Sequence, residues 1–281
     1  MIIQTYKGVK MKPLVLITGG GGYLGLPLVK HLIQSRNYNI LMSFDNINET
    51  IDDGIKADII IHLAAKLPSY KGDPNVIMET NFNATKKIVE QKSKSTTHFI
   101  FLSTDYVFES DGNKHFENSK RNPETIYGKS KALAEDYLLN ESNIDVTILR
   151  TSMLYGYDNP KRSNFFKFLH QKMIREEEVK LFSDVFSRPT HVRDLVTFVE
   201  KVIEEKILGV FHCSANRYIN RSDLGKLFCK ANNFDENLII ETTMPPDGRW
   251  PTELDLNPSV IFLEHMKYPI HIGVKKCLTK F

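Results

Sequence analysis

The chain has 281 residues, of which 41% are hydrophobic and 25% are charged, a composition typical of a soluble globular protein with a substantial core. Its 37 basic residues exceed its 34 acidic ones by only three, and no long basic block suggests nucleic-acid binding. Three cysteines without a Cys-x-x-Cys pair and nine histidines without metal-ligand spacing predict free thiols and no metal site.

The sequence also bears on membrane attachment and location. No apolar stretch reaches the length of a membrane span, and residues 1–10 lack the apolar core of a signal peptide. With the unpaired cysteines, this predicts a cytoplasmic protein that does not bind membranes. Residues 1–11 are expected to be an N-terminal extension, and the sequence leaves open whether the chain forms a homodimer.

A glycine-rich turn follows the first expected strand. The apolar run 14–17 predicts a buried strand, and apolar residues at helical spacing follow over 28–33. Between them, Gly19, Gly22 and Gly25 are spaced as in dinucleotide-binding turns, where glycine permits a tight turn and close approach to a pyrophosphate. A flexible loop is the alternative, but this strand–turn–helix context favours dinucleotide binding. Tyr23 and Leu24 are candidate cofactor contacts in the same turn.

Strands and helices then alternate along the chain, which predicts an α/β fold with a doubly wound parallel sheet, the Rossmann arrangement. The dinucleotide-binding domain is expected over 12–155 with about 188–215, and a smaller, irregular substrate-binding lobe over 156–187 and 216–281. The elements that support this are the strands 38–44, 57–65, 98–103, 145–150 and 209–213 and the helical stretches 76–92 and 165–177.

Asp45 bears on the choice of cofactor. It ends the second expected strand, about 20 residues beyond the glycine turn, where an acidic side chain accepts hydrogen bonds from a ribose 2′-hydroxyl and repels a 2′-phosphate. This favours NAD over NADP. Because the connection from Asp45 to Ala57 is short, an ordinary turn residue is the alternative.

Tyr127 and Lys131 occupy positions i and i+4 of an expected helix, so that their side chains leave the same face about one turn apart. A tyrosine hydroxyl has an unperturbed pKa of about 10. A nearby ammonium group favours the phenolate, so we expect Lys131 to lower the pKa of Tyr127 and to let the phenol exchange a proton. The pair alone is common on surface helices, and it gains weight from the other motifs.

Taken together, the motifs resemble the extended branch of the short-chain dehydrogenase/reductase family, in particular the dTDP-4-dehydrorhamnose reductases and their relatives. The resemblance covers nearly the whole chain from residue 12. It rests on residues 18–25, 58–65, 81–85, 103–108, 127–131, 149–156 and 187–194.

The resemblance implies NAD or NADP as cofactor and a nucleotide-sugar substrate. Tyr127 would protonate the C4 oxygen of a keto sugar as hydride arrives from the nicotinamide. Lys131 would lower the pKa of Tyr127 and bind the nicotinamide ribose, while Thr104 would hydrogen-bond the reacting carbonyl. Asn81 would steady the cofactor loop, and Leu63, Ala64 and Ala65 would lie along the cofactor.

The expected substrate contacts are Thr104, Asp105 and Met153, with Asn164, Arg188 and Arg249 as amide and guanidinium donors to a diphosphate sugar. A surface ion pair is the alternative for each arginine. Met153 departs from the family pattern, which usually has a tryptophan packed against the sugar at this position. Methionine is apolar and adaptable, so the site is expected either to accept a different sugar or to bind the sugar more loosely.

Two other kinds of function stay open, a different enzyme on the same scaffold and a non-catalytic subunit. Nucleotide-sugar 4-epimerases use the same tyrosine and lysine, and a 4,6-dehydratase is less favoured because Tyr106 replaces the glutamate of its Thr-Asp-Glu motif. A non-catalytic regulatory subunit like the beta subunit of methionine adenosyltransferase shares the string at residues 189–192, but the chain retains Thr104, Tyr127 and Lys131 together.

Overall fold

The computed structural model describes residues 11–43, 56–92, 96–156, 164–245 and 250–276. Its centre is a parallel six-stranded sheet in the order β11-β6-β4-β3-β1-β2. The chain runs outward from β1 to β2, returns to β3 and continues to the other edge, which confirms the predicted doubly wound α/β fold. The strands are β1 (Leu14–Thr18), β2 (Asn39–Ser43), β3 (Ile59–His62), β4 (His98–Thr104), β6 (Asp145–Thr151) and β11 (Gly209–Cys213).

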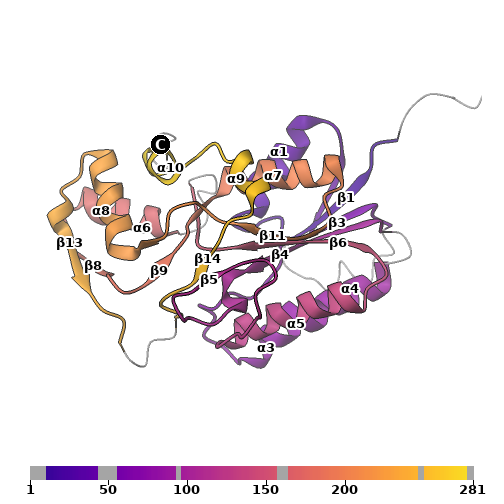
Figure 1. The fold of residues 1–281 in the computed structure, drawn as a ribbon. Coiled ribbons are helices and arrows are strands. Elements are labelled where there is room, and N and C mark those ends of the chain that lie inside the picture. Colours follow the sequence, from indigo (N-terminus) through magenta and orange to yellow (C-terminus); the bar gives the residue numbers. More distant parts are fainter. Residues whose placement is uncertain (1–10, 44–55, 93–95, 157–163, 246–249, 277–281) are drawn as a thin grey trace, which may run out of the picture.

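β1 and β3, at the centre of the sheet, are mostly apolar and buried because helices cover both faces of the sheet. α1, α7 and α9 lie on one face, and α3, α4 and α5 lie on the other (Figure 1). The stretch predicted as one helix over 76–92 runs from Asn75 to Lys92 and includes a π-helical turn, η1. The bounds are α1 (Gly25–Ser35), α3 (Asn75–Met78), η1 (Glu79–Asn83), α4 (Ala84–Lys92), α5 (Ile126–Asn140), α7 (Val192–Glu205) and α9 (Val260–His265).

The lobe lies beside the sheet and has its own apolar core (Figure 1). Phe166, Phe228 and Tyr155 meet there, with ring centroids 5.2 Å apart for the two phenylalanines and 5.4 Å apart for Tyr155 and Phe166. Its elements are α6 (Phe165–Ile174), β8 (Val179–Phe182), β9 (Phe186–Ser187), β12 (Ile219–Asn220), α8 (Arg221–Asn232), η3 (Glu236–Leu238), β13 (Ile239–Thr242) and α10 (Ile270–Lys276).

One part of the expected lobe packs elsewhere. α9 lies in the stretch 216–281, yet its Phe262 is fully buried with Phe198 of α7 in the core beside the main sheet. Short pairs of strands join the remaining segments: β5 (Lys114–His115) with β14 (Asp255–Leu256), and β7 (Leu154–Tyr155) with β10 (Thr190–His191). Among the helices that the structure describes, none is long and apolar enough to cross a membrane.

Candidate active site

Thr104 and Asp105 lie at the carboxyl end of β4, and both are buried. Thr104 ends the strand and caps the single turn η2 (Asp105–Val107), because its Oγ1 accepts a hydrogen bond from the Tyr106 backbone N–H at 3.3 Å. The same hydroxyl donates to Asp105 Oδ1 at 3.1 Å. The backbone turn and the carboxylate therefore hold the Thr104 hydroxyl from two sides.

Tyr127 begins the first turn of α5 and is buried against η2. Its ring meets Tyr106 edge-on, with centroids 5.6 Å apart. Gly128 makes this approach possible, since a Cβ at that position would lie 2.0 Å from the Tyr106 carbonyl oxygen. The sequence interpretation missed Gly128, although a glycine inside a helical pattern is itself a sign of close packing.

Lys131 lies one turn beyond Tyr127 and is also buried. Its Nζ is 4.0 Å from the ring centroid of Phe101, three residues before Thr104 on β4. The helix and the strand thus bring all three predicted catalytic side chains to one region of the molecule, at the end of β4.

The protonation states in this cluster follow from burial. The pKa of Tyr127 is raised well above its usual range, mainly by burial and to a smaller extent by the Asp105 carboxylate. The hydrogen bond with the Thr104 hydroxyl opposes this rise. The sequence pattern predicted instead that Lys131 would lower this pKa. Burial also lowers the pKa of Lys131 to about 7, opposed by the Glu135 carboxylate. Tyr127 is therefore a protonated phenol at neutral pH, suited to giving a proton.

Glu135 belongs to a buried charge cluster one turn beyond Lys131. Arg150 Nη2 donates to Glu135 Oε2 at 2.7 Å, and Arg121 Nη1 donates to the same oxygen at 3.0 Å. The Ser103 hydroxyl donates to Glu135 Oε1. Because these partners come from β4, β6 and a loop, the cluster anchors the Lys131 face of α5 to the sheet.

The glycine turn lies against the segment that follows β3. Gly19 has φ +71°, and a Cβ there would lie 2.8 Å from the Ala64 backbone nitrogen. The Gly22 N–H closes the turn on the Gly19 carbonyl at 2.9 Å, and Gly25 begins α1. Such an open turn at the start of a helix fits a dinucleotide pyrophosphate.

Asn81 connects this region to α5, the helix that carries Tyr127 and Lys131. Its Oδ1 accepts from the Lys66 N–H at 2.8 Å, and its Nδ2 donates to Ser130 Oγ at 3.0 Å. It thereby joins the chain beyond Leu63, Ala64 and Ala65 to α5. His62 ends β3 and is fully buried. Burial, and after it the charge of Lys131, lowers the pKa of the His62 imidazole to about 3, so this imidazole is neutral at neutral pH.

Three other predicted residues lie toward the helices α1 and α6. Leu24 is buried in the core beneath α1, which leaves its side chain turned away from the turn. The Tyr23 hydroxyl donates to the Gly156 carbonyl, and Asn164 Nδ2 donates to the Tyr23 oxygen at 3.1 Å. Asn164 also caps α6 through the Lys167 N–H at 2.9 Å. Its amide therefore contacts the glycine turn, with no contact to Thr104 or Tyr127 among the described residues.

Arg188 is held inside the lobe. Its Nη1 donates to the Asn216 carbonyl at 2.6 Å, and its Nε and Nη2 donate to the Asp255 carboxylate, the latter at 3.3 Å. Both charged side chains are buried. This is a buried ion pair rather than the surface pair considered as the alternative, and it occupies the guanidinium that was expected to bind substrate.

Arg221, at the start of α8, is the functional candidate that the sequence interpretation missed. Its Nη1 contacts Met153 Sδ and donates to Ser187 Oγ at 3.2 Å. Within the described part of the chain it forms no ion pair, while its charge acts on Asp105 and Tyr106. Met153 and Asp105, both predicted substrate contacts, thus flank a largely buried cation. No motif marked it, because only the fold brings α8 to the end of β6.

Two predicted residues, Asp45 and Arg249, lie outside the residues that the structure describes. Their proposed contacts stay predictions. In the described ranges, no group of three His, Cys, Asp or Glu side chains is placed to hold a metal ion.

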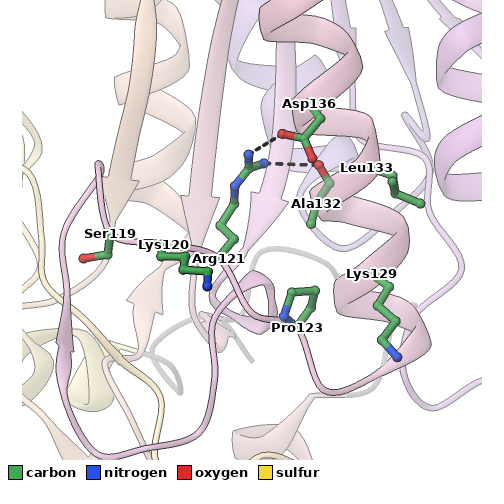
Figure 2. A pocket seen from close by; sticks show the side chains of 8 residues that line it. All are labelled: Ser119, Lys120, Arg121, Pro123, Lys129, Ala132, Leu133 and Asp136. Carbon is green, nitrogen blue, oxygen red and sulfur yellow. Dashed lines mark hydrogen bonds and ion pairs between the residues drawn. The ribbon is translucent and has the colours of Figure 1, made fainter.

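A separate pocket of about 610 Å³ lies on the outer side of α5, away from the Tyr127 and Lys131 face. Figure 2 shows Arg121 reaching across it to Asp136 and the Ala132 carbonyl. Lys129 and Leu133 lie on the helix beside it. None of the predicted site residues lines this pocket.

Comparison with known proteins agrees with this arrangement. Residues 11–249 match the family described as RmlD substrate binding domain. The Bacillus subtilis spore coat polysaccharide biosynthesis protein SpsK is 29% identical over 84% of this chain and 86% of its own. The dTDP-4-dehydrorhamnose reductase of Aggregatibacter actinomycetemcomitans is 30% identical over 69% of each chain. The methionine adenosyltransferase 2 subunit beta of Bos taurus is 24% identical over 95% of this chain and 87% of its own.

Solved structures share the fold. The dTDP-4-dehydrorhamnose reductase of Bacillus anthracis, crystallised with NADP, has a TM-score of 0.84 at 24% identity and covers 96% of this chain and 100% of its own. The Bordetella bronchiseptica enzyme WbmG, crystallised with NAD, has a TM-score of 0.80 at 18% identity and covers 97% of this chain and 94% of its own.

Proposed function

This chain belongs to the RmlD substrate binding domain family, and we propose that it is an NAD(P)H-dependent reductase of the C4 keto group of a nucleotide-activated deoxysugar. The observation that carries the proposal is the burial of Thr104, Tyr127 and Lys131 together at the carboxyl end of β4, next to a glycine turn that fits a dinucleotide. Ligands of doubly wound sheets bind at this edge.

Each residue has a role that its surroundings support. A bound nicotinamide would supply the hydride. Tyr127, kept protonated by burial, would give its proton to the carbonyl oxygen as negative charge develops there. Thr104 would donate a hydrogen bond to that oxygen, and Lys131 would bind the nicotinamide ribose and compensate the phenolate left on Tyr127.

The cofactor would lie along the glycine turn. Gly19, Gly22 and Gly25 would hold the pyrophosphate, and residues 63–65 would line its path. Asp45 supports NAD over NADP on chemical grounds, since a carboxylate repels a 2′-phosphate.

The substrate would bind between the sheet and the lobe. Met153 and Arg221 support this, because they join β6 and α8 through a sulfur–guanidinium contact beside Asp105. A guanidinium that forms no salt bridge in the described structure is suited to an anionic group such as the diphosphate of a nucleotide sugar. We therefore propose Arg221 as a substrate contact beside those predicted earlier.

A non-catalytic role is the second candidate, and the resemblance to the methionine adenosyltransferase 2 subunit beta supports it. The retained Thr104, Tyr127 and Lys131 oppose it. Co-purification of the chain with a methionine adenosyltransferase, together with no turnover of any keto sugar, would favour the regulatory role.

The reductase proposal is tested by incubating the purified protein with a panel of nucleotide-4-keto-6-deoxysugars and NADH or NADPH. We expect oxidation of the reduced cofactor, followed by absorbance, that depends on one or a few of these sugars. Interconversion of sugars with no net cofactor oxidation would point instead to a 4-epimerase. No reaction of any sugar with either cofactor would contradict the proposal.

A further inference from the structure

The Thr104 hydroxyl has a single proton, which it can donate to any one of several acceptors. In the reaction proposed above, that proton is useful when it points into the site, toward Tyr127 or the substrate oxygen. In the structure Thr104 Oγ1 lies 3.1 Å from Asp105 Oδ1 as its donor and also lies within hydrogen-bonding reach of the Tyr127 phenol, while the Tyr106 N–H occupies a lone pair of the same Thr104 oxygen. The direction of the Thr104 hydroxyl therefore depends on whether Asp105 can accept.

Asp105 can exist in both protonation states near neutral pH. Its carboxyl is buried, and burial raises its pKa to about 6 against the opposing effects of Ser152, Thr104 and Arg221. The groups facing it are the Arg221 guanidinium from α8, the phenols of Tyr106 and Tyr127, and the hydroxyls of Thr104 and Ser152. Arg221 is the only cation among them, and it favours the carboxylate of Asp105 together with the Ser152 and Thr104 hydroxyls, whose effects are larger.

We propose that Asp105 is a positioning residue that sets the direction in which Thr104 donates its proton, with Arg221 of the lobe stabilising the carboxylate. When Asp105 is ionised, it accepts the Thr104 proton across the 3.1 Å contact. When Asp105 is protonated, its O–H donates to Thr104 Oγ1, and the Thr104 proton turns toward Tyr127. The activity half of this proposal depends on the proposed reductase function.

The proton balance of a turnover follows from this arrangement. Tyr127 gives its proton to the carbonyl oxygen that receives hydride at its carbon, which leaves a phenolate. Thr104 passes its proton to that phenolate and takes the Asp105 proton in exchange. Asp105 becomes a carboxylate facing Arg221 and later regains a proton from water. Reduction should therefore be faster below the pKa of Asp105 and slower as pH rises through it.

Titration of the Asp105 carboxyl in the absence of substrate tests directly whether Thr104 and Arg221 stabilise its charged form. In protein labelled with ¹³C at the aspartate carboxyl carbons, the Asp105 signal is identified by its loss in Asp105→Asn. We expect Thr104→Val and Arg221→Gln each to raise the Asp105 pKa, because each removes a group that favours the carboxylate. Thr104→Ser, which keeps the hydroxyl, should leave it close to wild type. An unchanged pKa in both the valine and the glutamine variants would overturn the proposal.

Turnover supplies the second test. For a group with a pKa of about 6, the protonated fraction falls about fourfold between pH 5 and pH 6.5, and wild-type kcat should fall with it. The Asp105→Asn profile should lose this decline, whereas Thr104→Ser should retain it. A decline that persists in Asp105→Asn would contradict the proposal. If no keto sugar reacts, the reductase function fails, and the carboxyl titration still decides whether Thr104 and Arg221 govern Asp105.

Discussion

The end of β4 and the lobe that faces it hold their polar side chains in different ways. At the end of β4, the strand end places Thr104, and one turn of α5 places Tyr127 and Lys131. Lys131 forms no salt bridge within the described structure. In the lobe, Arg188 forms an ion pair with Asp255 and donates to a backbone carbonyl. Arg221 forms no salt bridge among the described residues, although its charge acts on Asp105.

The difference shows that the position of a side chain and its freedom to bind a ligand are separate properties. A strand end or an i,i+4 spacing predicts the direction in which a side chain points. This was sufficient to predict that Tyr127 and Lys131 lie on the same face of one helix. Whether an arginine is free depends on distant residues, since Asp255 meets Arg188 only through the fold. The following predictions are arranged to separate residues that act from residues that hold the structure.

Tyr127→Phe should produce the largest effect, a loss of kcat on the order of 10³–10⁴-fold, because the phenol is the proposed proton donor. Cofactor affinity should be nearly unchanged, since the ring still packs against Tyr106. Steady-state kinetics and fluorescence titration with NADH measure the two. Tyr137→Phe, a buried tyrosine on the same helix that faces the core, is the control and should keep most activity. A Tyr127→Phe enzyme with more than about a tenth of wild-type kcat would refute the assignment.

Arg188→Met should lower the free energy of unfolding by about 3–5 kcal/mol, because it leaves the buried Asp255 carboxylate without its partner. Arg221→Met, which breaks no ion pair, should cost less than about 1 kcal/mol and should instead raise KM for the substrate. Urea unfolding and steady-state kinetics compare the two variants. If Arg221→Met proves the more destabilising, the two arginines have been assigned the wrong way round.

Lys131→Met should reduce kcat by about a hundredfold and also weaken cofactor binding, because the lysine has two proposed partners. Lys129→Met on the outer face of α5 is the matched control and should change neither. In wild type, burial lowers the Lys131 pKa to about 7, so its charge is present below that pH and is lost above it. Cofactor affinity should therefore weaken as pH rises through 7. Unchanged affinity in Lys131→Met would remove the ribose contact.

Asp45→Ser should have the smallest effect, an increase of about tenfold in the NADPH to NADH ratio of kcat/KM, or roughly 1.4 kcal/mol. The reason is the loss of like-charge repulsion between a carboxylate and a 2′-phosphate. Kinetics with both cofactors provide the measurement. A wild-type enzyme that already prefers NADPH, or a variant with an unaltered ratio, would show that Asp45 does not contact the ribose.

The sheet and the proximity of Thr104 to Tyr127 and Lys131 could be predicted. They depend on local patterns: apolar runs, a glycine turn between strand and helix, and one helical turn from Tyr127 to Lys131. The raised pKa of Tyr127 could not, since it depends on burial and on Asp105, which only the packed structure reveals. Arg221 was missed for a related reason. Nothing in its neighbouring sequence indicates that α8 begins beside Met153.

The most direct test of the central claim is to follow hydrogen from the cofactor to the sugar. The protein is incubated with a nucleotide-4-keto-6-deoxysugar and with NADH or NADPH that carries deuterium at the transferable C4 position. Our account predicts deuterium at C4 of the product sugar, observed by NMR and mass spectrometry, in a one-to-one ratio with the cofactor oxidised, and none with Tyr127→Phe. Products without deuterium, or no product with any sugar of the panel, would contradict it.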